Sequence, residues 1–227
     1  MRTIAFVTQK GGSGKSTLAS SIAVAAHDAG ERVFIIDMDP LATLINWSKA
    51  RGEVDIPVEA VSVDKLRKVL TALEKQGATL VVIDTPGADV ETVAAAAKVA
   101  DLSIVPARPN AFDLWASDTT RAAIKSINRD YVFLLNQCPP AQQSARVEQG
   151  AKALELMGGL LTPLISSRVD FQEAARNGLG VTEHNPEGAA AVEIKSLWAS
   201  IKRRLAKGKP AKVPAKAPAK TPVKKAA

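Results

Sequence analysis

Cysteine, aromatic residues and long apolar runs are scarce in this 227-residue sequence. Its single cysteine, Cys138, rules out a disulfide framework and any CxxC metal or cluster site, and it suits a reducing cytoplasm. The first apolar run, residues 4–7, is too short for a signal peptide or a membrane span, and no stretch of about 20 apolar residues follows. These absences exclude a disulfide-rich secreted protein and a transmembrane protein, so we expect a soluble, cytoplasmic one.

Acidic residues are missing from the end of the chain. Residues 202–227 contain ten Lys or Arg and no Asp or Glu, whereas the first 201 residues hold 20 basic and 23 acidic residues. From residue 208 onward the sequence is a loose Pro-Ala-Lys repeat, in which proline opposes helix and strand and nothing can form a core. We therefore predict a folded domain over residues 1–207 and a disordered, extended basic tail over residues 208–227.

The folded part has the pattern of an α/β domain, and 46% apolar residues are enough for a core. Continuous apolar runs predict buried strands at residues 3–8, 32–37, 80–84, 102–106, 131–136 and 160–165. Helical patterns lie at residues 15–29, 41–51, 64–76, 90–99, 111–127, 142–157 and about 186–205. Apolar strands that are each followed by a helix favour a twisted parallel sheet with helices on both faces, which binds ligands beyond the carboxyl ends of its strands.

A glycine-rich segment, QKGGSGKST (residues 9–17), separates the first predicted strand from the first helix. Backbone N–H groups and a helix N-terminus at such a turn attract phosphate, the lysine reaches the β- and γ-phosphates, and the following serine binds Mg²⁺. The usual G-x-x-x-x-G-K-[ST] pattern would place glycine at position 9, but Gln9 stands there and a second lysine follows it. Taken alone, that lysine is explained equally well as a solvated loop charge. The predicted nucleotide-binding residues of the loop are Lys10, Gly11, Gly12, Ser13, Gly14, Lys15, Ser16 and Thr17.

Carboxylates end two of the predicted strands, in the segments DMDP (residues 37–40) and DTPG (residues 84–87). Capping of the next helix explains either segment alone. Three carboxylates that converge on a phosphate loop, Asp37, Asp39 and Asp84, would instead supply oxygen ligands for Mg²⁺ and a group that positions the attacking water.

The segments KGGSGKST, DMDP and VVIDTPG together resemble the deviant Walker A, switch I and Walker B motifs of the ParA/MinD family of P-loop ATPases, over about residues 3–205. The segment NWSKA (residues 46–50) is similar to small plasmid-partition members that lack an N-terminal DNA-binding domain. Nothing precedes the first predicted strand, so we expect that domain to be absent. The resemblance implies a P-loop NTPase fold of the deviant Walker type, with ATP and Mg²⁺ as cofactors and hydrolysis of ATP to ADP and phosphate.

The resemblance also implies roles for individual residues. Lys10 would cross the interface of an ATP-bound homodimer to the partner's phosphates, while Lys15 serves its own nucleotide, so that hydrolysis depends on assembly. Asp39 would orient the attacking water, Ser16 would ligate Mg²⁺ directly, and Asp84 would hold the ion through water. The predicted catalytic residues are thus Lys10, Lys15 and Asp39, and the predicted metal-site residues are Ser16, Asp39 and Asp84.

Three further positions follow from the resemblance. Asp37 is expected to support switch I. Asn136 matches the asparagine that reads adenine in the family, although a cap at the end of its strand explains it equally well. Leu41 replaces the glutamine found in many members, so any polar role of that side chain is missing here.

The basic tail favours DNA over membrane as a binding surface. Its only large apolar residues beyond position 207 are Val213 and Val223, so insertion into a bilayer would bury little. Lysines can neutralise DNA phosphates without reading sequence, although solubilisation alone also explains such a tail. Arg168, Arg176 and Lys195 could extend a basic face near the last helix. The predicted DNA-binding residues are Lys202, Arg203, Arg204, Lys207, Lys209, Lys212, Lys216, Lys220, Lys224 and Lys225.

Together these features predict an ATPase that dimerises with ATP, binds nonspecific DNA on the nucleoid, and positions or segregates a cargo such as a plasmid, a chromosome region or a large protein assembly. A ParB-like or cargo-adaptor protein would stimulate its hydrolysis. Two alternatives stay open: a metabolic P-loop enzyme of the same fold, similar to dethiobiotin synthetase, and a DNA-coating protein with a vestigial nucleotide site.

Overall fold

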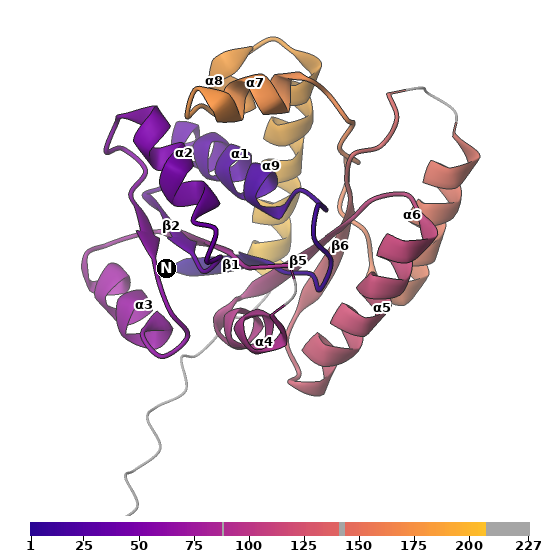
Figure 1. Ribbon diagram of the computed structural model, residues 1–227, viewed down its shortest axis with the longest axis horizontal. Coiled ribbons are helices and arrows are strands. Elements are labelled where there is room, and N and C mark those ends of the chain that lie inside the picture. The colour runs from indigo at the N-terminus through magenta and orange to yellow at the C-terminus, as the bar shows by residue number, and fades with distance from the viewer. Residues whose placement is uncertain (88, 141–143, 208–227) are drawn as a thin grey trace, which may run out of the picture.

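A six-stranded parallel sheet forms the centre of the molecule (Figure 1). The computed structural model describes residues 1–87, 89–140 and 144–207, and the strand order is β3-β2-β4-β1-β5-β6. The strands are β1 (Arg2–Phe6), β2 (Val33–Asp37), β3 (Val58–Ala60), β4 (Leu80–Asp84), β5 (Leu102–Ala107) and β6 (Tyr131–Leu135). All five pairings are parallel, which confirms the predicted sheet and places β1 between β4 and β5.

Helices cover both faces of this sheet. Within the described residues they are α1 (Lys15–Asp28), α2 (Thr43–Arg51), α3 (Leu66–Lys75), α4 (Val90–Val99), α5 (Ala111–Ser126), α6 (Ala145–Gly158), α7 (Asp170–Arg176), α8 (Val181–His184) and α9 (Ala189–Lys207). In Figure 1, α1, α2 and α7 to α9 lie above the sheet, and α3 and α4 lie below it. The seven predicted helices are present, with ends displaced by at most three residues, and the predicted start of α6 at residue 142 falls outside the described residues.

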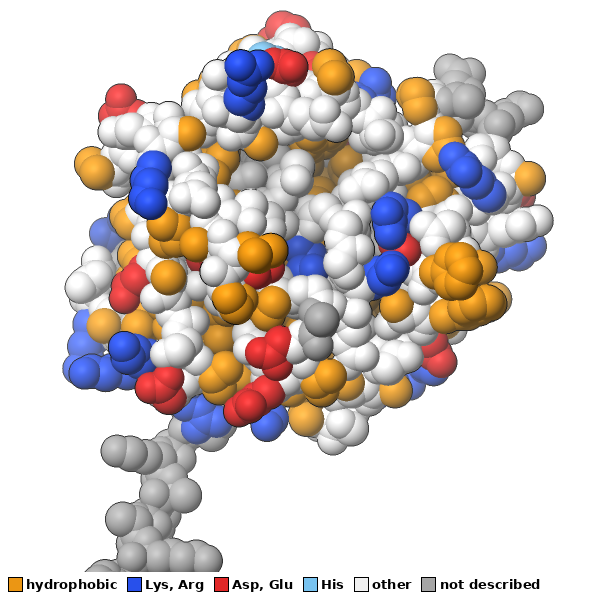
Figure 2. Space-filling view, in the orientation of Figure 1, with side chains coloured by type: hydrophobic (Ala, Val, Ile, Leu, Met, Phe, Trp, Pro, Cys, Tyr) orange, Lys and Arg blue, Asp and Glu red, His pale blue; other side chains and the backbone are white. Residues whose placement is uncertain are grey.

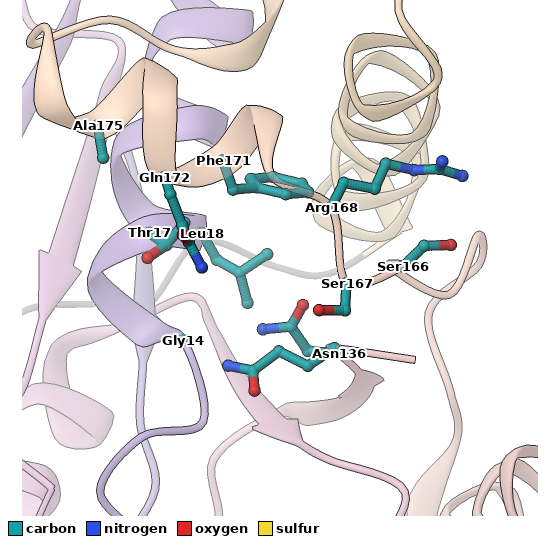
Figure 3. Close-up of a pocket in the computed structure, with 11 residues that line it drawn as sticks. Gly14, Thr17, Leu18, Asn136, Ser166, Ser167, Arg168, Phe171, Gln172 and Ala175 are labelled. Atoms are coloured by element: carbon teal, nitrogen blue, oxygen red, sulfur yellow. The ribbon is translucent and has the colours of Figure 1, made fainter. Parts of the chain in front are cut away.

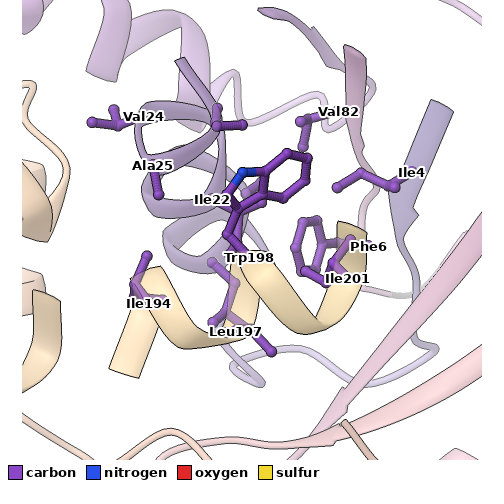
Figure 4. Packing of buried hydrophobic residues seen from close by; sticks show 14 of the residues in the cluster. Ile4, Phe6, Ile22, Val24, Ala25, Val82, Ile194, Leu197, Trp198 and Ile201 are labelled. Atoms are coloured by element: carbon purple, nitrogen blue, oxygen red, sulfur yellow. The ribbon is translucent and has the colours of Figure 1, made fainter. Parts of the chain in front are cut away.

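Side chains on the two faces of β1 pack into two separate hydrophobic clusters. Ile4 and Phe6 point into the cluster that contains α1 and α9, whereas Ala5 and Val7 point into the cluster with α3 to α6, as the alternation of a strand requires. Figure 4 shows Trp198 of α9 packed among the side chains of α1 and β1. Burial of each such large side chain contributes roughly 2 kcal/mol, so the strand that precedes the glycine-rich loop is firmly held.

One strand prediction is wrong. Residues 160–165 form no strand. Two isolated bridges, Phe133 to Leu160 and Cys138 to Ser166, and a hydrogen bond from the N–H of Ile165 to the backbone oxygen of Leu135 connect this segment with the chain that runs through and beyond β6. Pro163 lies between the bridges, and proline has no N–H group for a strand ladder.

Short elements account for the other differences. Strand β3 has three residues and is largely exposed, and α7 and α8 have seven and four residues, so none of them carries a readable period. Helix α2 begins at Thr43 rather than at residue 41, after Ala42 in a left-handed conformation with φ of 52°. The predicted tail over residues 208–227 lies outside the described residues.

No helix in the described part of the chain has the length and apolarity needed to cross a bilayer.

Candidate nucleotide-binding site

The glycine-rich loop joins the carboxyl end of β1 to the N-terminus of α1, the position at which a helix dipole and loop N–H groups attract anions. Gly12 and Gly14 have φ angles of 77° and 89°, a conformation that side-chain-bearing residues rarely adopt. Gly14 is also the N-cap of α1, and the amide of Asn136 occupies the space that a side chain there would need. The sequence spacing of these glycines therefore matches a backbone requirement.

Lys15 lies inside this loop with 7% of its surface exposed. Its ammonium donates a long hydrogen bond to the backbone oxygen of Lys10 at 3.5 Å, and no ion pair is formed by it within the described residues. Burial lowers the pKa of Lys15, and the charges of Asp84 and Asp39 oppose that shift. A buried cation with so little compensation is well suited to bind a phosphate.

Ser16 and Asp84 meet beside the loop. The Ser16 hydroxyl donates to Oδ2 of Asp84 at 2.6 Å, and the other carboxylate oxygen, Oδ1, is buried without a hydrogen-bond partner. Burial raises the pKa of Asp84 to about 7, and the charge of Asp37 adds to the shift, while Ser16 and Lys15 oppose it. An unpaired buried oxygen beside a serine hydroxyl fits the oxygen-only chemistry of Mg²⁺.

The protein would supply few ligands to such an ion. Across residues 1–87, 89–140 and 144–207, no group of three or more His, Cys, Asp or Glu is arranged to hold a metal. Mg²⁺ commonly keeps several waters and binds through one or two protein oxygens together with nucleotide phosphates, which is the arrangement that Ser16 and Asp84 can serve.

Asp37 organises the segment that follows β2. Its carboxylate is 1% exposed and accepts hydrogen bonds from the N–H groups of Asp39 at 3.0 Å, Leu44 at 2.9 Å and Ile45 at 3.2 Å. It thereby caps α2 from outside the helix and ties the segment from Asp39 to Ile45 to the end of β2. Asp39 is half-buried and accepts one hydrogen bond at Oδ1 from the N–H of Leu41 at 2.9 Å. Leu41 itself is 78% exposed.

Asn136 and its neighbour Gln137 hold the loop from the side of β6. The Asn136 amide donates to the backbone oxygen of Ser13 at 2.8 Å, and the Gln137 amide donates to that of Gly12 at 3.1 Å. Sequence reasoning missed Gln137, which has a positive φ of 53° at the end of the strand. Both side chains therefore fix carbonyls of the phosphate loop, whatever else they bind.

A cavity of about 340 Å³ opens next to these two residues. Figure 3 shows Asn136 at its floor, with Phe171 and Arg168 on the opposite wall. A mixed apolar and polar cavity of this size at the N-terminus of α1 can accept a nucleoside, so the adenine role and the structural role of Asn136 are compatible. The lining residues are Gly14, Thr17, Leu18, Asn136, Gln137, Ser166, Ser167, Arg168, Phe171, Gln172 and Ala175.

Lys10 has a different environment from Lys15. Its side chain is half-exposed, and within the described residues its ammonium makes no hydrogen bond or ion pair, although its backbone N–H donates to Thr8 Oγ1 at 3.3 Å. One lysine of the loop is thus buried, and the other is available to an outside group.

Two further contacts that sequence reasoning missed brace the outer side of the loop. A side chain at Gly87 would come within 3.0 Å of the backbone of Gly11, so the segment after β4 packs directly on the loop. Arg108, which follows β5, lies beside Gly12 and makes a forked ion pair with Asp113 at 2.9 and 3.1 Å. Neither contact has a local sequence signal, because each partner lies far away in the chain.

The predicted DNA-binding cations that the structure describes lie at the opposite edge of the sheet. Lys202 is 3.3 Å from Glu31, Arg204 is 2.9 Å from Asp130, and Arg203 donates to Ser200. Lys207 is the last residue of α9 and is exposed. The remaining six, Lys209, Lys212, Lys216, Lys220, Lys224 and Lys225, lie outside the described residues.

The broader basic face is not gathered in one place. Arg168 and Arg176 line cavities beside α1 and the phosphate loop, whereas Lys202 lines a cavity with Arg2 and Thr79 at the amino edge of the sheet. Helix α9 is roughly 28 Å long at 1.5 Å per residue, so its two ends lie near different edges of the sheet.

Comparison with known proteins identifies the domain. A family model described as the CobQ/CobB/MinD/ParA nucleotide binding domain matches residues 4–181. The chain belongs to this family. The matched region of this MinD/ParA-type domain includes the sheet, the phosphate loop and the carboxylates described above, and it ends at the start of α8.

Similarity to individual proteins extends over most of the chain. The Maintenance of carboxysome distribution protein A of Gloeobacter kilaueensis is 29% identical over 85% of this chain and 89% of its own length. The protein of the same name from Halothiobacillus neapolitanus is 26% identical over 84% of this chain and 91% of its own length. The structure of the septum site-determining protein MinD of Pyrococcus horikoshii, complexed with Mg-ADP, superimposes with a TM-score of 0.71 at 19% identity, over 89% of this chain and 96% of that chain. This MinD/ParA-type domain therefore has the P-loop NTPase fold that the sequence predicts.

Proposed function

We propose that this chain is an ATPase that dimerises when it binds ATP and Mg²⁺, attaches to nonspecific DNA and positions a cargo. The observation that carries the proposal is the difference between the two loop lysines: Lys15 is buried under the loop, and Lys10 is half-exposed with no partner for its ammonium in the described residues. One nucleotide needs only the first lysine. The second has a use when another subunit brings its own phosphates to it.

The roles of the remaining residues follow from their contacts. Ser16 and Asp84 would hold Mg²⁺ between protein and phosphate oxygens, and Asp37 would keep the switch I segment in place. Asp39, with one carboxylate oxygen engaged by Leu41, would use the other to orient the attacking water. Lys10 of the second subunit would stabilise the negative charge of the transition state, so turnover would depend on dimerisation.

The names of the relatives support a positioning role. Two curated relatives are named for maintenance of carboxysome distribution, and a third, 33% identical over half of this chain, is named ParA. A cargo that is a large assembly or a plasmid is therefore our proposal for this chain as well. A partner protein that carries the cargo would stimulate hydrolysis.

DNA attachment would use the cations that begin at the end of α9. A dimer would carry two sets of them, and bivalent contact would raise avidity without new chemistry. Because each phosphate contact releases counterions, the affinity should fall steeply with salt.

The experiment that tests this function measures the affinity for a random-sequence DNA duplex with ATP and with ADP at two salt concentrations. Wild type should bind DNA more tightly with ATP. Lys10→Ala should still bind ATP but lose dimerisation, turnover and the difference between the two nucleotides. The matched control is Lys125→Ala, which removes the same charge from an exposed site at the far end of α5 and should keep that difference.

Three outcomes would contradict the proposal. A monomeric Lys10→Ala that hydrolyses ATP at the parental rate would refute the role of that lysine. Equal DNA binding with both nucleotides, together with turnover of a small-molecule substrate, would favour a metabolic enzyme. DNA binding without any ATP turnover, even with a partner present, would favour a vestigial site.

A further inference from the structure

An arginine at the end of α2 uses every donor of its guanidinium group. The Arg51 side chain is 5% exposed and donates five hydrogen bonds, to Asp55 at 2.8 and 2.6 Å, to Glu183 at 2.9 and 2.7 Å, and to the backbone oxygen of Gly178 at 3.1 Å. A guanidinium has five N–H groups, so all of them are engaged. Asp55 follows α2 directly, but Gly178 and Glu183 belong to the α7–α8 segment, so Arg51 joins two distant parts of the chain.

Two further contacts fasten the end of α7 to α2. The indole N–H of Trp47, one turn before Arg51, donates to the backbone oxygen of Leu179 at 3.2 Å. Gly178 has no room for a side chain, because the backbone of Arg51 lies where its Cβ would be. The chain that leaves α7 is therefore in direct contact with the last turn of α2.

Helix α7 forms part of the wall of the nucleoside-sized cavity. Figure 3 shows Phe171, Gln172 and Ala175 of this helix around that cavity. A second cavity, of about 260 Å³, lies between α7, α1 and α2, and Ala175 lines both. The face in Figure 2 is hollowed beneath the region of α7 and α8. With open space on two sides and two buried side chains, Phe171 and Ala174, α7 depends on contacts at its end for its position.

Helix α2 is a suitable anchor because it is held at both ends. Asp37 at the end of β2 accepts hydrogen bonds from the N–H groups of Leu44 and Ile45 in its first turn. Leu44 and Trp47 are 1% and 5% exposed and belong to the same core cluster as α1. A segment that is tied to α2 is thus tied to the sheet that carries the phosphate loop.

We propose that Arg51 and Glu183 are positioning residues of the nucleotide site: their ion pair holds α7 where its side chains contact the nucleoside. This role rests on the proposed ATP binding and names residues outside the cavity on which the affinity of the site depends. Neither residue lines the cavity, so both act through α7. A site of this kind needs such support, because small displacements of a supporting element weaken binding.

A purely structural role would stabilise the fold without affecting nucleotide binding, and Asp55 separates the two explanations. Each carboxylate accepts two hydrogen bonds from Arg51 and one from a backbone N–H, that of Ile56 for Asp55 and that of Gly180 for Glu183. Removal of either carboxylate leaves Arg51 paired with the other one, so no buried charge loses its counterion. Only Glu183 belongs to the α7–α8 segment.

Calorimetric titration with Mg-ADP compares Glu183→Ala, Asp55→Ala and wild type. Glu183→Ala should raise the dissociation constant by on the order of tenfold, whereas Asp55→Ala should stay within about twofold of wild type. The other neighbour of Asp55, His27 at 3.7 Å, lies at the C-terminal end of α1, away from the cavity. Urea denaturation should show similar losses of stability for the two variants, because they remove the same number of hydrogen bonds.

Steady-state ATP hydrolysis gives a readout that a structural role would not change. Glu183→Ala should raise KM by about the same factor as the ADP dissociation constant and leave kcat near that of wild type, because the phosphate loop and Asp39 are not displaced. Glu183→Gln retains an acceptor for the N–H of Gly180 and for one donor of Arg51, so it should recover most of the lost affinity.

The outcomes that would overturn the proposal differ from those that would overturn the proposed function. Equal loss of ADP affinity in Glu183→Ala and Asp55→Ala, or no loss in either, would show that the Arg51 network only stabilises the fold. If wild type binds no ADP, the proposed function fails and this role fails with it. If the ADP affinities follow the expectation but wild type hydrolyses no ATP, the positioning role stands and the proposed function fails.

Discussion

Replacing Asp84 with asparagine should make the nucleotide-free protein more stable at pH 8. The carboxylate is fully buried, and burial raises its pKa from 3.8 to about 7, so at pH 8 the folded protein carries a costly buried charge. At 1.36 kcal/mol per pKa unit, a shift of about 3 units sets a ceiling of roughly 4 kcal/mol. The introduced amide would put a buried donor where Oδ1 now has no partner, which costs about 1–3 kcal/mol. We therefore expect a net gain of about 1–3 kcal/mol.

The gain should depend on pH in one direction. Because the folded protein holds the Asp84 proton more tightly than the unfolded chain does, the stability from protonation is fully present below pH 3.8 and is lost as the pH rises through about 7. Near pH 4, where the wild-type carboxyl is protonated and only the cost of the amide remains, Asp84→Asn should thus be less stable than wild type by about 1–3 kcal/mol. The difference should rise between pH 4 and 7, change sign, and level off above pH 7 at the net gain. Urea denaturation at several pH values, with EDTA and without nucleotide, measures it.

Asp118→Asn is the matched control. That carboxylate is 56% exposed and pairs with Arg121 on the surface of α5, so its removal should change stability by less than about 1 kcal/mol. A stability gain for Asp84→Asn that is the same at pH 4 and pH 8, or no gain at pH 8, would refute the reasoning that the buried carboxylate is costly when ionised.

Three further predictions concern the loop, switch I and the tail. Asp39→Ala should accumulate as an ATP-loaded dimer, and undiminished phosphate release would overturn its assignment. Removal of residues 208–227, which contain six lysines, should weaken DNA binding and lower the salt slope by up to about 5, measured by titration at several salt concentrations; an unchanged slope would show that the folded domain alone holds DNA. Gly87→Ala should weaken nucleotide binding in calorimetry, because its Cβ would lie 2.9 Å from the Cα of Gly11; wild-type affinity would mean that this segment shifts freely.

Five of the six strands were predictable from sequence because they are short, mostly apolar and bounded by turn residues. Strand β3 could not be recognised, since three mostly exposed residues at the edge of a sheet have no pattern. Residues 160–165 were wrongly predicted as a strand for the opposite reason, because this segment does have an apolar pattern. An apolar pattern indicates burial, but it does not show whether the backbone can form a strand ladder, and Pro163 has no N–H group to donate to one.

The candidate site divides in the same way. The loop and the carboxylates at the ends of β2 and β4 were predictable, since each lies in a contiguous segment with a fixed chemical requirement. Gln137 and Arg108 were not, because they reach Gly12 only through the order of strands in the sheet. The N–H of Gln9 likewise donates to Thr120 Oγ1 of α5 at 3.3 Å, a contact across 111 positions of the chain.

The contacts of the site separate groups that are already fixed from groups that are still available. Hydrogen bonds from Asn136 and Gln137 hold the loop carbonyls, and Asp37 holds the segment after β2. In the proposed function, Lys10 and the second oxygen of Asp39 are the groups that act on the terminal phosphate, and neither is engaged within the described residues. Binding and turnover would thus depend on different parts of the loop, so a second subunit could control hydrolysis without altering how the first one binds ATP.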